Sequence, residues 1–222
     1  MKQMRMKSQQ SGFTLVEIAI VLVIIGLLLG GILKGQELIN SAKVKNIAND
    51  FRVIPTYIYA YQDKFKSLPG DDSQVAIHVT GGTPGTGGTL GNGVIEGAWN
   101  AAETGTAESN IFWQHVRLAN VAAGPTTPAA GYAPINAVGG RIGVSSATAA
   151  QVQITGMTGT YQVCSAGILG KFAKQLDIQM DDGVTNTGSM RAVPDGSPLG
   201  TAGDAAIDAT EEANPYTVCM TF

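Results

Sequence analysis

Residues 12–34 read GFTLVEIAIVLVIIGLLLGGILK, an almost unbroken apolar run near the start of the chain. As a helix rising ~1.5 Å per residue, the roughly 21 residues from Phe13 to Leu33 would span about 31 Å, the thickness of the hydrocarbon core of a bilayer. Glu17 lies inside this run. A carboxylate in an apolar membrane helix costs about 2.5–3.5 kcal/mol on insertion scales, so we expect a positively charged group to offset it.

More than one kind of N-terminal segment contains such a run. Lys2, Arg5 and Lys7 precede it with no acidic residue among them, as in a secretory signal. An ordinary signal also needs a cleavage site of small residues after the run, and here Lys34 follows the last glycines too closely for a good match. No cysteine lies near the run, which excludes a lipoprotein signal. A plain membrane anchor is the simplest alternative.

The sequence SGFTLVE at residues 11–17 resembles the processing motif of type IV prepilins and type II secretion pseudopilins. The resemblance is close over residues 7–40 and holds only in outline beyond them. It implies that a prepilin peptidase cleaves between Gly12 and Phe13 and methylates the new N-terminus on Phe13. It also implies that Glu17 neutralises the N-terminal amine of a neighbouring subunit during assembly. The amine of Phe13 in the same chain, one helical turn away, is an alternative partner, because opposite charges attract strongly in a low dielectric.

The resemblance implies a structural function, as a fimbrial subunit of a type IV pilus or pilus-like filament. The chain would be made as a prepilin and assembled from the bacterial inner membrane, where it is single-pass with a periplasmic head, into an extracellular or periplasm-spanning filament. The implied partners are other pilin subunits in a homo- or hetero-polymer, the prepilin peptidase, the inner-membrane assembly platform and the membrane. The alternatives are a type II secretion pseudopilin, or a minor or tip pilin with an adhesive role.

The composition argues against nucleic-acid binding and offers no catalytic constellation. The chain has 14 Lys and Arg against 17 Asp and Glu, a net charge of −3, and only 6% aromatic residues. We therefore expect neither a basic patch nor a stacking surface for nucleic acid. No nucleophile motif surrounds His115, and His78 is equally isolated, so we expect no enzyme and no two-histidine metal site. A structural or surface role is the prediction for His115.

The resemblance implies a leader at 1–12 and a transmembrane or filament-core half of a long helix at 13–34. The pattern along the chain predicts its amphipathic half at 35–66 and a globular head at 67–222. Pro55 should kink the helix. We expect an α+β, pilin-like fold in which the amphipathic half packs on a small antiparallel sheet. Its apolar stripe at helical spacing consists of Val44, Ile47, Phe51, Ile54, Ile58, Tyr61 and Phe65.

Turn residues and alternation divide the head further. Residues 80–93 are rich in Gly and Thr but contain no Lys, which predicts a surface loop rather than a phosphate-binding loop. Alternating apolar residues predict strands at 151–154 and 161–164, within the stretch 141–166, and a final strand at 215–222.

Two short helices are expected in the head, at 109–123 and 167–178. Ser109 or Asn110 should cap the first, and Gly124 with Pro125 should end it. The expected core residues are Phe112, Val116 and Ala119 in the first helix, and Ile168, Phe172, Leu176 and Ile178 in the second.

The two cysteines, Cys164 and Cys219, both lie in the head. An export-type N-terminus implies an oxidising compartment, so we expect them to form a disulfide that closes a loop of about 55 residues. Basic residues lie on both sides of the apolar run, so they do not decide the orientation. The cysteines place the head on the outer side.

Asp181 and Asp182 begin a segment, 181–188, that is rich in side-chain oxygens and glycine. Such a segment suits Ca²⁺, and the resemblance adds that some pseudopilins carry a calcium loop near the C-terminus. The spacing of an EF-hand and its terminal glutamate are missing. A turn with solvated carboxylates is therefore favoured over a Ca²⁺ site, and no other cofactor is expected.

Overall fold

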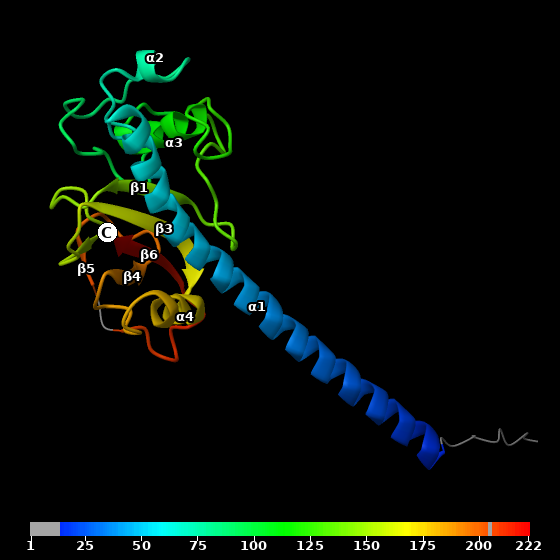
Figure 1. The fold of residues 1–222 in the computed structure, drawn as a ribbon. Helices are drawn as coiled ribbons and strands as arrows, with labels where there is room; N and C mark the ends of the chain where they lie inside the picture. Colours follow the sequence, from blue (N-terminus) through cyan, green and yellow to red (C-terminus); the bar gives the residue numbers. More distant parts are fainter. Residues whose placement is uncertain (1–13, 204–205) are drawn as a thin grey trace, which may run out of the picture. The chain divides into compact units, whose positions relative to one another are not determined.

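The computed structural model describes residues 14–203 and 206–222 (Figure 1). The chain forms two compact units, with the boundary between Ser41 and Ala42. We call them the N-terminal unit and the C-terminal unit. The described part of the N-terminal unit is helical from Leu15 onward, and the C-terminal unit is α+β.

Helix α1, Leu15–Phe65, is one element that belongs to both units. Its second half buries one stripe in the core of the C-terminal unit, and Phe65 is partly buried at the end of that stripe. Pro55 does not end the helix, and beside it Thr56 Oγ1 donates a hydrogen bond to the Val53 carbonyl at 2.6 Å. The predicted stripe is confirmed. Its buried members are Val44, Ile47, Phe51, Ile54, Ile58 and Tyr61.

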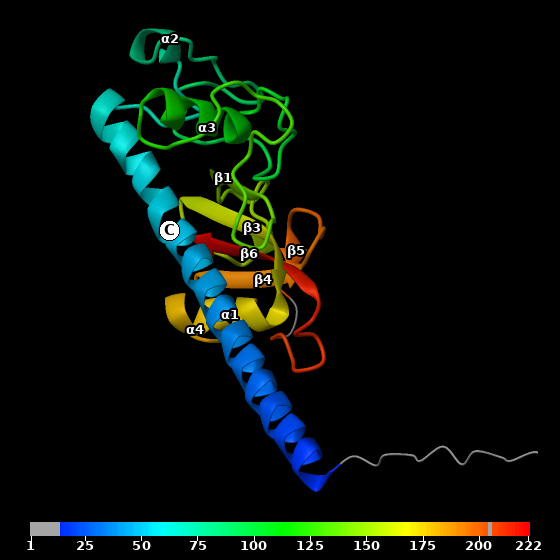
Figure 2. The ribbon, with the colours of Figure 1, turned by 90° about the vertical axis from the view of Figure 1, so that its right-hand side faces the viewer.

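A four-stranded antiparallel sheet lies at the centre of the C-terminal unit, in the order β1-β3-β6-β4. The second half of α1, the helices α3 and α4 and one face of this sheet share a single hydrophobic core. Figure 2 shows the second half of α1 running across the sheet, with α3 and α4 on opposite sides of the strands. The arrangement is the α+β, pilin-like one that the sequence predicted. The strands are β1 (Ile142–Ser146), β3 (Tyr161–Leu169), β4 (Met190–Pro194) and β6 (Pro215–Thr221).

The two central strands are buried on both faces. Val163 and Val218 join the core that contains α1, whereas their neighbours Cys164 and Cys219 join a smaller core that also contains Trp99. This division follows from the alternation of side chains along a strand. Cys164 lies opposite Cys219 in the pairing of β3 with β6, and the predicted disulfide joins them.

The sequence did not predict every strand. A two-stranded parallel sheet pairs β2, Ile154–Thr155, with β5, Thr201–Ala202. Neither β4 nor β5 was predicted, and the strand expected at 151–154 retains only Ile154. The Gln153 amide donates to the Gln162 side chain, at 3.0 Å to Oε1, so it does not pair with a strand backbone.

Helix α3 spans Glu108–Leu118 and is shorter than predicted. Its N-cap is Ala107, so the prediction that Ser109 or Asn110 caps it is wrong: Ser109 Oγ donates to the Ala98 carbonyl instead. The helix ends before Gly124 because Asn120 adopts a left-handed φ of 59°. The Val121 amide then donates to Val116 O and the Asn120 amide to Arg117 O, which is a Schellman motif. The predicted core residues Phe112, Val116 and Ala119 are buried.

Two further helices complete the fold: the short α2, Val75–His78, and α4, Gly170–Met180. The helix expected at 167–178 therefore begins and ends later, and Ile168 is the buried end of β3 rather than a helical residue. Phe172 and Leu176 are buried as predicted, but Ile178 is 69% exposed. Two residues after Leu176 a helix has turned about 200°, which places Ile178 on the opposite face.

Candidate functional site

The apolar part of the N-terminal unit is exposed along its whole length. The α1 helix contains the one segment in the described chain that is long and apolar enough to cross a membrane, with a mean hydropathy of 2.8 and no buried residue in its most apolar window. Isolated exposed apolar side chains are ordinary, but a continuous surface of them marks a membrane or protein interface. The exposed residues are Leu15, Val16, Ile18, Ile20, Val21, Leu22, Val23, Ile24, Ile25, Leu27, Leu28, Leu29, Ile32 and Leu33.

Glu17 takes part in a capping box at the start of α1. Its Oε2 accepts hydrogen bonds from the Thr14 amide at 2.8 Å and from Thr14 Oγ1 at 2.7 Å, while the Glu17 amide lies 3.3 Å from Thr14 Oγ1. The Thr-x-x-Glu spacing that signals such a box was present in the sequence but was not recognised. The predicted cleavage and methylation at Gly12 and Phe13 lie outside the described residues.

The two histidines have different surroundings. His115 is fully buried, accepts a hydrogen bond from the Gly70 amide on Nδ1 at 2.9 Å, and donates from Nε2 to the Thr83 carbonyl at 2.9 Å. Burial lowers the pKa of His115. This neutral ring joins the turn after α1 to the following loop, which is a structural role. His78 lies 2.6 Å from the buried carboxylate of Asp72.

The segment with Asp181 and Asp182 forms a turn closed by its own side chains. Asp181 Oδ2 accepts the Met190 amide at 2.8 Å, and Asp182 accepts the Val184 amide and the Thr187 hydroxyl at 2.9 and 2.6 Å. The fold adds Asp177, which is 1% exposed and whose Oδ2 has no hydrogen-bond partner. We call these three residues the C-terminal aspartate cluster; their oxygens lie within 4.8 Å of one another.

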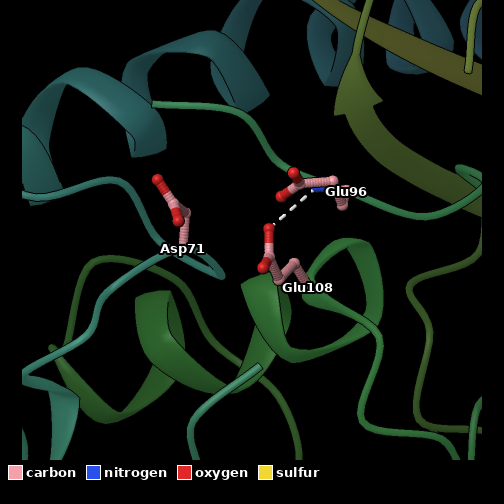
Figure 3. Close-up of side chains that lie close together, drawn as sticks. All are labelled: Asp71, Glu96 and Glu108. Carbon is pink, nitrogen blue, oxygen red and sulfur yellow. Dashed lines mark hydrogen bonds between the residues drawn. The ribbon is translucent and has the colours of Figure 1, made fainter. Parts of the chain in front are cut away.

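A second acidic group, which the sequence did not predict, consists of Asp71, Glu96 and Glu108; we call it the three-carboxylate cluster (Figure 3). Asp71 follows the end of α1, Glu96 lies in the long loop before α3, and Glu108 is the first residue of α3. Each offers an oxygen within 4.8 Å of the others. Residues spread over such a length of chain form no local motif, so no sequence signal pointed to them.

Burial dominates the electrostatics of the three-carboxylate cluster. Asp71 is 2% exposed and Glu108 is fully buried. Burial raises the pKa of Asp71, and burial together with the neighbouring Glu96 raises the pKa of Glu108 to about 8. The positive end of the α3 dipole favours a carboxylate at this position, but that contribution is smaller than the burial effect.

Residues 7–33 match the family profile described as the prokaryotic N-terminal methylation motif. This motif is the signature of type IV prepilins and pseudopilins, and it marks a structural class rather than an enzyme class. It implies processing by prepilin peptidase and assembly into pilin polymers, and with the apolar helix it suits membrane anchoring before assembly. The searches of curated proteins and of solved structures gave no match.

Proposed function

We propose that this chain is a structural subunit of a type IV pilus or pilus-like filament, cleaved after Gly12, N-methylated on Phe13 and polymerised from the bacterial inner membrane. The observation that carries the proposal is the methylation motif at residues 7–33 directly on an exposed apolar helix. Cleavage before the apolar run leaves that run on the mature protein. The product therefore stays in the membrane until assembly removes it.

In the filament, the exposed surface of α1 would be buried against other subunits. In the bilayer, lipid covers these side chains, and in the filament the same surface of neighbouring copies replaces the lipid. Association between apolar helices then depends on close packing. Gly26, Gly30 and Gly31 have no side chain and face open space in the single chain, so a neighbouring helix could approach them closely.

Glu17 would define the register of the added subunit. In the described residues its Oε2 is held by Thr14, while no hydrogen bond engages Oε1. That oxygen can accept the methylated amine of Phe13 from a neighbouring subunit without breaking the capping box. A buried ammonium–carboxylate pair is favoured over two separately buried charges, so the subunit adds where the pair forms.

The disulfide supports a head on the outer side of the membrane. Cys164 and Cys219 are joined within the sheet, and disulfides persist in the periplasm and outside the cell but rarely in the cytosol. The assembly platform in the inner membrane and the prepilin peptidase would be the partners before polymerisation. A type II secretion pseudopilin shares the motif and mechanism, and the disulfide-linked C-terminal strand favours a pilin, or a minor or tip pilin, over it.

Two variants, Glu17→Ala and Thr14→Ala, test the proposal in cells that carry the assembly machinery. Mass spectrometry of the wild-type subunit should show a chain that begins with N-methylated Phe13. Glu17→Ala should insert in the membrane at the wild-type level and lose most of its sheared filaments. Thr14→Ala removes the capping hydroxyl but keeps the carboxylate, so it should still assemble.

Two results would contradict the proposal. A mature chain that begins anywhere other than Phe13 would exclude prepilin processing. An undiminished filament yield from Glu17→Ala would exclude the role of the carboxylate in subunit addition. The pseudopilin alternative would be selected if the wild type makes no surface filaments and a strain that lacks the subunit loses protein secretion.

A further inference from the structure

The three-carboxylate cluster of Asp71, Glu96 and Glu108 takes no part in the proposed assembly through α1. Its side chains converge from three separate segments of the C-terminal unit (Figure 3). Two of the three are essentially buried, at 2% exposure for Asp71 and 0% for Glu108. Carboxylates that are removed from water in this way need a positive partner or a proton.

The described chain supplies no such partner. Within residues 14–203 and 206–222, none of the three carboxylates lies within 4.0 Å of a Lys, Arg or His nitrogen. Glu108 Oε2 accepts the Glu96 amide at 2.9 Å, but the buried Glu108 Oε1 has no hydrogen-bond partner. Glu96 Oε1 accepts Asn92 Nδ2 at 2.7 Å, and its Oε2 is likewise unpartnered. Two buried acceptors in this cluster therefore have no hydrogen-bond donor.

We propose that Asp71, Glu96 and Glu108 bind a divalent cation, and that the cation is Ca²⁺. The donor set consists of carboxylate oxygens, which hard cations prefer. Oxygens bound to Ca²⁺ at 2.3–2.6 Å can lie up to about 5 Å apart, and the three carboxylates lie within 4.8 Å of one another. Mg²⁺ requires shorter contacts and usually retains several waters, which a buried set of protein ligands suits less well.

The loop before α3 lies close to these carboxylates at two of its glycines. A Cβ on Gly88 would overlap the carboxylate of Glu96, and a Cβ on Gly85 would overlap Glu108 Cγ, so only glycine permits this approach. The same loop orients Asp71, whose oxygens accept the amides of Gly91, Asn92 and Gly93. The abundance of glycine at residues 80–93 thus has a local reason.

One member of the cluster, Asp71, also lines an open cavity. Asp71 lines a cavity of about 360 Å³ together with Gly91, Gly93 and Lys66. Lys66 pairs with the Asp63 carboxylate at 3.3 Å, so its ammonium is engaged outside the cluster. A bound ion would link the turn after α1, the Gly-rich loop and the start of α3. It would stabilise the C-terminal unit by RT ln(1 + [Ca²⁺]/Kd).

The C-terminal aspartate cluster provides the matched control. Asp181 and Asp182 accept hydrogen bonds from Met190, Val184 and Thr187, which hold them in a closed turn. If Ca²⁺ bound there instead, Asp182→Asn would remove binding and Glu108→Gln would not. The two substitutions each replace one carboxyl group with an amide and change the side-chain shape little.

The experiment is a calorimetric and thermal titration of the full chain in detergent micelles, freed of metal by a chelator and then given CaCl₂ alone. We expect one Ca²⁺ per chain at the three-carboxylate cluster and, at about 100 times the Kd, a rise in Tm of about 5 °C or more. At the same Ca²⁺ concentration, Glu108→Gln should weaken binding at least tenfold and so reduce that rise by about half or more, while Asp182→Asn should retain both. Without Ca²⁺, Glu108→Gln should melt no lower than the wild type, because the Gln carbonyl oxygen can still accept the Glu96 amide and burial already favours an uncharged group at this position.

Three outcomes would overturn the proposal. The first is the absence of heat and of a Tm shift in the wild type at millimolar Ca²⁺. The second is a Ca²⁺ affinity that falls less than tenfold in Glu108→Gln, or Ca²⁺ binding that is lost in Asp182→Asn. The third is tighter binding of MgCl₂ than of CaCl₂, which would exclude Ca²⁺ as the preferred ion. Should Glu108→Gln fail to fold by circular dichroism, Glu96→Gln at the partly buried ligand tests the same prediction. None of these outcomes bears on the filament proposal, which depends on α1.

Discussion

The two halves of α1 have the same backbone conformation but differ in what covers them. In the second half, one stripe of side chains is buried by the chain itself, and the opposite face is polar. In the first half, apolar side chains occupy every face, and none of the most apolar window is buried. An apolar stripe can find its partner within a single domain, whereas an apolar surface on all faces requires a partner outside the chain.

Because of this difference, substitutions in the two halves of the helix should have different effects. Substitutions in the second half should change the stability of the C-terminal unit. Substitutions in the first half should leave that stability unchanged and alter membrane insertion or assembly. Three predictions follow the comparison from the largest expected change in unfolding free energy to the smallest.

Phe51→Ala should produce the largest change. Phe51 is fully buried in the main core, and truncating a buried aromatic residue typically costs about 3–5 kcal/mol. Chemical denaturation of the full chain in detergent, followed by the tryptophan fluorescence of the C-terminal unit, measures the loss. The matched variant Leu27→Ala, at a residue that is 74% exposed, should stay within about 0.5 kcal/mol of the wild type. Equal losses in the two variants would refute the distinction between the halves.

Removing the disulfide with the double variant Cys164→Ser, Cys219→Ser should have the next largest effect. The bridge spans a sequence separation of 55 residues, and disulfides of this kind typically contribute about 2–4 kcal/mol. The same denaturation experiment measures the loss, and membrane insertion should be unaffected because the bridge lies in the C-terminal unit. A variant as stable as the wild type would show that the paired strands β3 and β6 do not need the bridge.

The sequence predicted the elements whose pattern is strong over many residues. The long helix, its stripe and the strands containing Cys164 and Cys219 follow from periodicity, and they are confirmed. The missed strand β4 lies at the sheet edge, where its Arg191 and terminal Pro194 are tolerated but weaken the signal of a strand.

Local details decided the remaining differences. The end of α3 depends on Asn120 in a left-handed conformation, which glycine usually supplies, so Gly124 was the more obvious stop. The capping box at Thr14 and Glu17 was readable but was overlooked in favour of an intermolecular role. The three-carboxylate cluster was not readable, because only the tertiary fold brings a turn, a loop and a helix start together.

The smallest effect is expected at Asp50, on the second half of α1. Burial raises the pKa of Asp50 from 3.8 to about 6. The native state therefore binds a proton that the unfolded chain has lost, and stability falls as the pH rises from about 4 to about 6. Asp50→Asn should gain roughly 1 kcal/mol above that interval, after a discount for the solvent screening of a half-exposed group.

The pH dependence distinguishes this effect from an ordinary surface substitution. Below about pH 4 the Asp50 carboxyl is protonated in both states, so Asp50→Asn should lose its advantage there. Asp63→Asn is the control on the same helix, because the Asp63 side chain is 91% exposed, and it should stay within about 0.5 kcal/mol of the wild type at every pH. Denaturation midpoints at pH 4, 6 and 8 measure both variants. An advantage for Asp50→Asn that is the same at all three pH values would show that burial of the charge is not its cause.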